Sequence, residues 1–266
     1  FSDIDLRYVR GFDMFLQKRG CCGNTRKFYF KALRAILNRA NAEGVGSVAT
    51  YPFGRGGFEV SKLEEATAKR YLPAAELSKL KSATASNPQC EYARKLFLFS
   101  YYCYGISFID MAMLTAAHIK QMEDGDYIVY KRQKIKRQKG VKPISIKITP
   151  AIRQLIGSLQ AASPTVDDFL LPIVTRSGYT GERLYMHIRT RYSKYQKYLR
   201  LLAEELGIDF HLTSYVSRHT AAMTLQRNHI PREVISQMLG HADLETTNIY
   251  LDSFDNEVIN EAAKVL

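Results

Sequence analysis

The residues of this chain best suited to chemistry lie near its carboxyl end. They fall in three short runs, Arg218-His219-Thr220, Leu239-Gly240-His241 and Thr246-Thr247-Asn248-Ile249-Tyr250. A tyrosine hydroxyl, with a pKa near ~10, becomes a useful nucleophile only when nearby cations and donors stabilise its ionised form. Arg218 offers a planar fork for two phosphate oxygens, and His241 can donate to a phosphate or help to remove the tyrosine proton. These residue types favour metal-free cleavage of a phosphodiester with Tyr250 as the nucleophile.

A run of positive charge supplies a further cation. Residues 131–142 have the sequence KRQKIKRQKGVK, with seven basic residues and no acid. The flanking stretches 127–130 and 144–148 alternate with a period of two, which predicts a β-hairpin with a short third strand nearby. We expect this two-stranded ribbon to enter a nucleic-acid groove or follow a phosphate backbone; the alternative is a solvated tip that only aids solubility. The residues expected to act here are Lys131, Lys136, Arg137 and Lys139 as phosphate contacts and Lys134 as the acid for a leaving 5′-oxygen.

A second basic cluster, residues 183–200, interleaves positive and aromatic side chains on a predicted helix. The basic members expected to bind nucleic acid are Arg189, Arg191, Lys194 and Lys197, and the tyrosines between them are Tyr185, Tyr192, Tyr195 and Tyr198. Such interleaving is common on faces that contact phosphates, and the alternative is that the tyrosines belong to the core. Two separated basic surfaces predict a protein that wraps around its partner.

The composition restricts the class of partner and the compartment. The 266 residues carry 38 basic and 26 acidic side chains, a net charge of +12, which predicts nucleic acid or an acidic membrane surface as the partner. Four cysteines without a CxxC pair predict a reducing compartment and no metal site. We expect a cytoplasmic protein that is associated with the bacterial nucleoid. The most apolar run, 96–109, is about 14 residues long, short of the ~20 that span a bilayer, and predicts a buried helix.

The predicted elements are mainly helices with one small sheet, an α+β fold class. Apolar residues at helical spacing predict helices over 3–19 and from about 24 to 44, and the stretch 44–57 then holds five of the sixteen glycines. We therefore expect a helical domain over 1–52, a linker over 53–72 and a larger domain over 73–266. In the larger domain, Asn87-Pro88 predicts the start of a helix.

At several of these points the sequence resembles the tyrosine recombinase (phage integrase) family. The R-H-T run, the LGH run and a Tyr nine residues after that His match family motifs. Residues 104–111, YGISFIDM, resemble the first active-site box and are similar to integrases of Bacteroides-type mobile elements; Lys134 lies where the family has its catalytic lysine. The resemblance implies a two-domain clamp, with 1–52 as its core-binding domain. It also implies strand exchange on double-stranded DNA through a 3′-phosphotyrosyl intermediate and a Holliday junction, without a cofactor.

Two positions depart from the family pattern. The first box normally has Arg two residues after the Gly, whereas this chain has Ser107, whose hydroxyl can donate one hydrogen bond to a phosphate but carries no charge. We expect Arg132, two residues before Lys134 and on the same strand face, to supply the missing cation, with Arg94 as second choice. In the HxxR motif the His position holds Tyr215, which is a weaker acid–base partner near neutral pH.

The resemblance further implies four protomers on paired DNA sites, and it leaves open an accessory DNA-bending protein as another partner. The tail after Tyr250 is expected to pack either on a neighbouring subunit or on its own domain. Two other functions stay open. One is a type IB topoisomerase-like nicking-closing enzyme, which uses the same chemistry, and the other is a DNA-binding protein that has lost catalysis, which Ser107 and Tyr215 allow.

Overall fold

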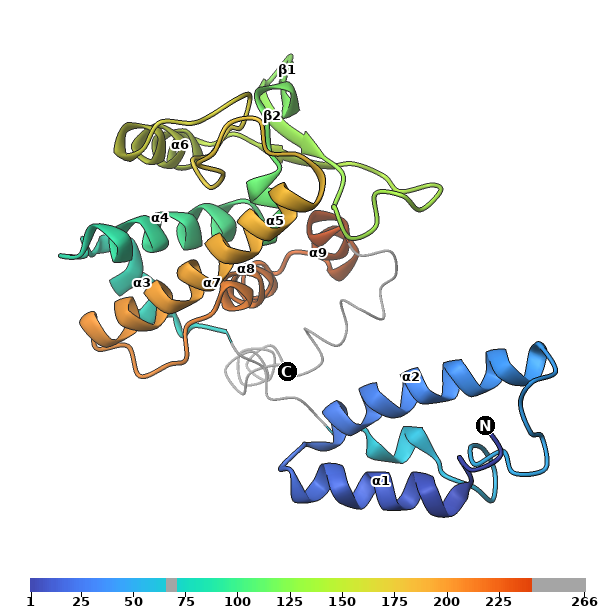
Figure 1. Ribbon diagram of the computed structural model, residues 1–266. Coiled ribbons are helices and arrows are strands. Elements are labelled where there is room, and N and C mark those ends of the chain that lie inside the picture. The colour runs from blue at the N-terminus through green and yellow to red at the C-terminus, as the bar shows by residue number, and fades with distance from the viewer. Residues whose placement is uncertain (66–70, 241–266) are drawn as a thin grey trace, which may run out of the picture. The chain divides into compact units, whose positions relative to one another are not determined.

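The computed structural model describes residues 1–65 and 71–240 and divides into two compact units, Phe1–Ala68 and Lys69–Leu266 (Figure 1). Each unit has a hydrophobic core of its own. The expected nucleophile Tyr250, the expected proton-transfer residue His241 and the tail after Tyr250 lie outside the described residues.

The N-terminal unit pairs two helices, α1 (Leu6–Lys18) and α2 (Gly23–Ala42), with a short 3-10 helix, η1 (Val60–Leu63). The Asp5 carboxylate caps α1 by accepting a hydrogen bond from the Tyr8 amide at 2.8 Å. Val9 of α1 and Phe30 of α2 are fully buried between the two helices. The predicted helices over 3–19 and 24–44 are therefore confirmed, within the usual uncertainty of helix ends.

Part of the segment 53–72 packs into this N-terminal core. Phe53 and Val60 are 6% and 3% exposed, and the ring of Phe58 lies 4.5 Å from that of Phe30. The prediction of a linker that begins at residue 53 is thus wrong for these residues. The glycines between them suggested a solvated loop, but the three apolar side chains gain more free energy by leaving water than the loop loses by becoming ordered.

The C-terminal unit is mainly helical. In chain order its elements are α3 (Ala74–Ser82), α4 (Pro88–Tyr102), α5 (Phe108–Ala112), η2 (Ala116–His118), β1 (Ile119–Met122), β2 (Gly125–Tyr130), β3 (Ile144–Lys147), α6 (Pro150–Ala162), α7 (Gly181–Glu205), α8 (Ser214–Arg227) and α9 (Arg232–Leu239). Asn87 caps α4 by accepting a hydrogen bond from the Gln89 amide at 2.8 Å, with Pro88 at the first helical position. The helix start predicted at Asn87-Pro88 is confirmed.

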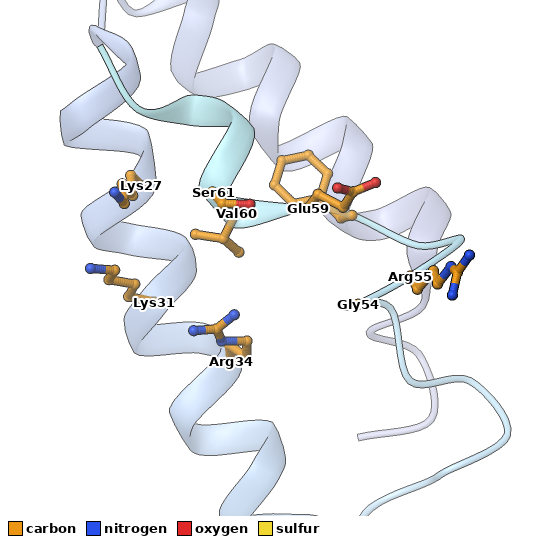
Figure 2. Close-up of a pocket in the computed structure, with 9 residues that line it drawn as sticks. Lys27, Lys31, Arg34, Gly54, Arg55, Glu59, Val60 and Ser61 are labelled. Atoms are coloured by element: carbon orange, nitrogen blue, oxygen red, sulfur yellow. The ribbon is translucent and has the colours of Figure 1, made fainter. Parts of the chain in front are cut away.

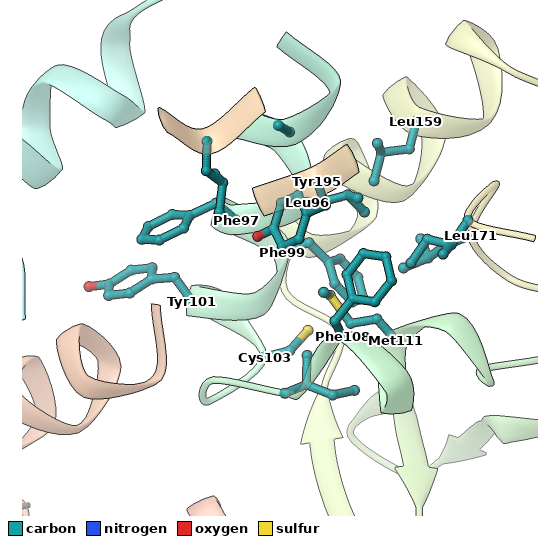
Figure 3. Packing of buried hydrophobic residues seen from close by; sticks show 14 of the residues in the cluster. Leu96, Phe97, Phe99, Tyr101, Cys103, Phe108, Met111, Leu159, Leu171 and Tyr195 are labelled. Atoms are coloured by element: carbon teal, nitrogen blue, oxygen red, sulfur yellow. The ribbon is translucent and has the colours of Figure 1, made fainter. Parts of the chain in front are cut away.

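Helix α4 forms the centre of the C-terminal core and contacts α6, α7 and α8. Residues 96–101 of this helix are all buried, as expected of an apolar helical segment in a core. Figure 3 shows Phe99 of α4 among Phe108, Leu171 and Tyr195, which come from other parts of the unit. The apolar run over 96–109 is therefore a core helix and the turn that follows it, as predicted. Across the described ranges, no helix combines the length and apolar character needed to cross a membrane.

The sheet is antiparallel, in the order β1-β2-β3. Ile128 of β2 pairs with Ile146 of β3, and Tyr130 pairs with Ile144, so one face of the sheet is apolar and packs on the core. The predicted strands on either side of the basic run are confirmed, and β1 is the predicted third strand.

The basic run itself is not part of the ribbon. Strand β2 ends at Tyr130 and β3 begins at Ile144, so residues 131–143 form a loop of turns, named the basic loop below. In Figure 1 this loop extends away from the sheet. The basic run is thus the turn between the two strands of the predicted hairpin, where its like charges do not have to face one another across paired strands.

Candidate active site

Arg218 lies at the centre of the candidate site. It sits on α8 and is only 4% exposed, and its two terminal nitrogens donate to the carbonyl oxygens of Gly105 (Nη1, 3.1 Å) and Leu239 (Nη2). Burial, together with repulsion from Arg132, lowers the pKa of the Arg218 guanidinium to about 10. The guanidinium therefore stays charged at neutral pH, in a position fixed by two backbone carbonyls.

Gly105 lets the turn before α5 approach α8. Its φ is +72°, in the left-handed region, and a Cβ at this position would lie 2.4 Å from the Cα of Arg218. Only glycine fits so close to another backbone. Ser100 also links the turn to α8. Its hydroxyl donates to the Ile106 carbonyl at 2.8 Å and lies 2.7 Å from the hydroxyl of Ser217 on α8. The glycine of the first box thus positions Arg218.

Arg132 reaches the same place from the basic loop. Its Nη1 donates to the Gly240 carbonyl at 3.2 Å, one residue beyond the carbonyl that Arg218 binds. Gly240 ends α9 in the left-handed conformation, with φ +63°, and a Cβ there would lie 2.3 Å from Ile144 Cδ1. The unpaired carbonyls at a helix carboxyl end carry partial negative charge, which accommodates two guanidinium groups side by side.

Ser107 has a structural role. Its hydroxyl donates to Asp110 Oδ2 at 2.6 Å and accepts from the Asp110 amide at 3.3 Å, which caps α5. The Ser107 hydroxyl proton is directed to Asp110 in this structure, and a contact from Ser107 to a phosphate stays a prediction. At the position where the family has a cation, this chain therefore has a serine that caps α5.

Asp110 was missed by sequence analysis. This carboxylate is 3% exposed, and its Oδ1 accepts a hydrogen bond from the backbone amide of Gln133 at 2.7 Å. Gln133 lies between Arg132 and Lys134, so Asp110 anchors the basic loop at these two residues. The Ser-x-x-Asp spacing of a helix cap could have identified Asp110 as the residue that binds Ser107.

Lys134 is exposed on the basic loop, and Arg132 is half-buried. Both residues follow the end of β2, so the prediction that they share a strand face is wrong. Arg94, the second choice for the missing cation, is occupied elsewhere. Its guanidinium pairs with Glu91 at 2.7 Å and donates to the Leu80 carbonyl at 2.8 Å.

Tyr215 lies in the first turn of α8, one turn before Arg218, and is 53% exposed. Its ring meets that of His219 edge-on, with the ring centroids 4.7 Å apart. Partial burial raises the pKa of Tyr215, which keeps the phenol protonated at neutral pH. At the position expected for the HxxR histidine, the chain therefore presents a neutral hydrogen-bonding group.

A pocket of about 550 Å³ joins these parts, and we name it the arginine pocket. It is lined by residues 105–109, by Arg132, by one face of α7 and by the start of α8. The candidate residues that it brings together are Ser107, Arg132, Arg189, Tyr215 and Arg218.

The other candidate DNA contacts differ in exposure. Those on the basic loop and on the outer face of α7 are exposed, namely Lys131, Lys136, Arg137, Lys139, Lys194 and Lys197. Arg191 instead points inward, where its Nε donates to the Ile173 carbonyl at 3.1 Å. Tyr195 is 4% exposed and belongs to the core, which was the alternative for the tyrosines of this helix.

The N-terminal unit has a basic pocket of its own, of about 700 Å³ (Figure 2). Lys27, Lys31 and Arg34 project from α2 on one side, and Arg55 lies on the loop across from them. Lys27 pairs with Glu64 at 2.7 Å and so lowers the pKa of that carboxyl group. Arg55 was not predicted as a basic contact, because it lies in a glycine-rich stretch that was assigned to the linker.

Comparison with known proteins agrees with this geometry. Residues 70–257 match the model of the phage integrase family, and residues 1–59 match that of the phage integrase SAM-like domain. The chain belongs to the phage integrase family, and the resemblance found in its motifs is confirmed.

Two curated relatives match parts of the chain. Tyrosine recombinase XerD of Halalkalibacterium halodurans is 43% identical over 54 residues, which is 20% of this chain and 18% of the relative. Tyrosine recombinase XerC of Rhodospirillum centenum is 31% identical over 114 residues, which is 43% of this chain and 31% of the relative. The matched regions therefore span less than a third of either relative.

Solved structures share the fold across nearly the whole chain. The Tn1549 transposon integrase in complex with a circular intermediate DNA has a TM-score of 0.66 at 12% identity, covering 100% of this chain and 87% of that one. The XerH site-specific recombinase bound to difH has a TM-score of 0.66 at 18% identity, covering 99% and 71%. The predicted fold class, mainly α with a small antiparallel sheet, is confirmed.

Proposed function

We propose that this chain is a site-specific DNA recombinase that cuts and rejoins strands through Tyr250. One observation carries the proposal. Arg218 of α8 and Arg132 of the basic loop converge on the carboxyl end of α9, and His241 is the next residue of the chain. Two guanidinium groups beside a pocket suit the two non-bridging oxygens of a phosphodiester. Membership of the phage integrase family supports the same function.

In the proposed reaction the hydroxyl oxygen of Tyr250 attacks the scissile phosphorus, and the bond from phosphorus to the 5′-oxygen breaks. The phenolic proton passes to His241, and the departing 5′-oxygen takes a proton from Lys134. The 3′-phosphate is then held as a phosphotyrosyl ester. Attack on this ester by a 5′-hydroxyl from the second duplex reverses each step, so the ester itself supplies the energy for rejoining.

We assign the charge missing at Ser107 to Arg132. Arg132 and Arg218 donate to the consecutive carbonyls of Gly240 and Leu239, so the two cations are close neighbours and repel each other. A phosphate between them would neutralise this repulsion, whereas the carbonyls at the end of α9 do so only in part. Asp110 holds the loop at Gln133 and so keeps Arg132 in place.

Replacing Arg132 with alanine should therefore slow covalent attachment to DNA by about 100-fold or more, the effect of removing one preorganised phosphate contact. Arg132→Lys should recover part of the rate, because it retains the charge but loses the fork. The measurement is the single-turnover rate at saturating DNA. Gln138→Ala, an exposed position of the same loop with no expected phosphate contact, is the control and should keep a near wild-type rate. A rate for Arg132→Ala equal to that of Gln138→Ala would assign the missing charge to another residue.

Double-stranded DNA is the proposed substrate, and four protomers on paired sites are the proposed assembly. The net charge of +12, the exposed cations of the basic loop and of α7, and the basic pocket of the N-terminal unit all favour a polyanion. The related integrase and XerH structures contain DNA, which supports the same partner.

The proposed function is tested with a suicide duplex, meaning a nicked duplex selected from a random library by covalent capture on the protein. The recombinase should attach covalently to this duplex and then join its strand to a second duplex. Relaxation of supercoiled DNA without exchange between duplexes would instead identify a topoisomerase-like enzyme. Binding of DNA without any covalent product would identify a DNA-binding protein that has lost catalysis.

A further inference from the structure

The arginine pocket is larger and more apolar than a phosphate requires. Phe108 and Ile109 line it from α5, and Tyr185 and Tyr192 line it from α7. A phosphate needs only hydrogen-bond donors and positive charge, which Arg132 and Arg218 already offer. The aromatic part of the pocket is therefore available for another group, and its volume of about 550 Å³ lies within the ~300–1,000 Å³ range of small-molecule sites.

The inner wall of the pocket is rigid. The Phe108 ring stacks on buried Tyr195, with ring centroids 5.1 Å apart and an interplanar angle of 21°, and it lies 5.3 Å from the Tyr192 ring. The Tyr192 hydroxyl lies 3.1 Å from Ser214 Oγ and accepts a hydrogen bond from Gln196 at 2.8 Å. These contacts hold the two rings in place before any ligand arrives.

The outer wall is exposed. Tyr185 and Tyr215 are 59% and 53% exposed, yet both line the same pocket as the fixed Tyr192 ring. Two exposed rings and one fixed ring thus converge on a single space. Such rings suit a flat aromatic ligand, because every nucleobase has a π-face on which tyrosine can stack.

The charge in the pocket identifies that ligand. Arg189 lines the pocket from α7, in addition to Arg132 and Arg218. A ligand that combines a phosphodiester with a flat aromatic group satisfies both parts of the pocket, and a nucleotide of a DNA strand has this composition. A strand whose phosphate lies between Arg132 and Arg218 carries its next nucleoside within the reach of the aromatic wall.

We propose that the arginine pocket takes the nucleoside next to the scissile phosphate, with its base unstacked from the duplex and lying against the tyrosine rings. The proposal rests on the proposed function, because the nucleoside is defined by the cut. Unstacking costs a few kcal/mol, and stacking on tyrosine returns about 1–3 kcal/mol for each base. The pocket therefore favours cleavage at steps that unstack easily, and its aromatic residues contribute to the choice of site.

The test places 2-aminopurine in the suicide duplex, once on each side of the cut and once five base pairs away. Stacked bases quench this fluorophore strongly. With wild-type protein bound, fluorescence at one of the two flanking positions should rise several-fold over that of the free duplex, and the distant position should not change. Fluorescence at both flanking positions equal to that of the free duplex would overturn the proposal.

Variants of Tyr185 separate base capture from general effects. Tyr185→Ala should remove most of the fluorescence rise and slow attachment about tenfold at saturating DNA, while Tyr185→Phe, which keeps the ring, should behave like wild type. Met186→Ala is the matched control, since Met186 is the neighbouring residue on α7, is 48% exposed and does not line the pocket.

The possible failures can be told apart. If Tyr185→Ala and Met186→Ala behave alike, the pocket does not bind the base. If the protein forms a covalent product but fluorescence does not rise, the nucleoside proposal fails and the recombinase function stands. If no duplex is captured covalently, the recombinase function fails, and the nucleoside proposal fails with it.

Discussion

Replacing Arg218 with alanine should reduce covalent attachment to the suicide duplex by about a thousandfold or more. The variant loses the guanidinium charge beside the arginine pocket, and a single preorganised contact to the reacting group is worth ~10²–10³ in rate. Arg218→Lys should recover little, because an ammonium group cannot reach the carbonyls of Gly105 and Leu239 with a fork. The rate is measured in single turnover at saturating DNA.

The control must separate lost chemistry from lost packing. Removing Arg218 also leaves two buried carbonyls without a donor, at about 1–3 kcal/mol each. Arg94→Ala is matched in this respect, since Arg94 is 9% exposed and donates to the Leu80 carbonyl but lies outside the arginine pocket. It should lower the stability of the fold and leave the rate near wild type. If Arg218→Ala retained a rate within tenfold of Arg94→Ala, Arg218 would not contact the reacting phosphate.

The second large effect is expected at Gly105. Alanine there must take a positive φ and place its Cβ 2.4 Å from the Arg218 Cα, so the turn before α5 and helix α8 must separate. Backbone strain costs about 1–2 kcal/mol and the clash about 1–3 more, and the displaced Arg218 should lower the rate about 100-fold. Thermal unfolding and the single-turnover rate measure the two parts.

Gly178→Ala distinguishes strain from displacement. Gly178 has the same φ of +72°, but a Cβ there has nothing within 4 Å. This variant should lose about 1–2 kcal/mol of folding stability through backbone strain alone and keep its single-turnover rate. Equal rates for the two glycine variants would show that the approach of Gly105 to Arg218 has no role in the chemistry.

Where local sequence chemistry determines structure, the elements could be predicted. Asn87-Pro88 starts a helix for local reasons. The Asn87 side chain accepts a hydrogen bond from an amide of the first turn, and Pro88 has no amide hydrogen that needs a partner, so the signal does not depend on the surrounding fold. The strands on either side of the basic loop followed from alternation of apolar residues. Arg132 could be proposed from the sequence because the missing charge at Ser107 required a substitute nearby.

The predictions failed at positions whose structure depends on contacts with residues far away in the sequence. Residues 53–63 look like a loop from their glycines, yet Phe53 and Val60 are buried against the N-terminal helices, a gain that no local pattern reveals. Arg132 and Lys134 were assigned to one strand face, but β2 ends at Tyr130, before both residues. Asp110 was overlooked because its role depends on Gln133, 23 residues further along the chain.

The central claim is that Tyr250 becomes covalently bonded to DNA, and the identity of the attached residue tests it most directly. Wild-type protein trapped on the suicide duplex is digested with nuclease and protease, and the peptide that carries a nucleotide is sequenced by mass spectrometry. The account predicts that the nucleotide is on Tyr250, one of seventeen tyrosines, and that Tyr250→Phe yields no adduct. A nucleotide on Tyr215, which lines the arginine pocket beside Arg218, or an adduct that persists in Tyr250→Phe, would contradict it.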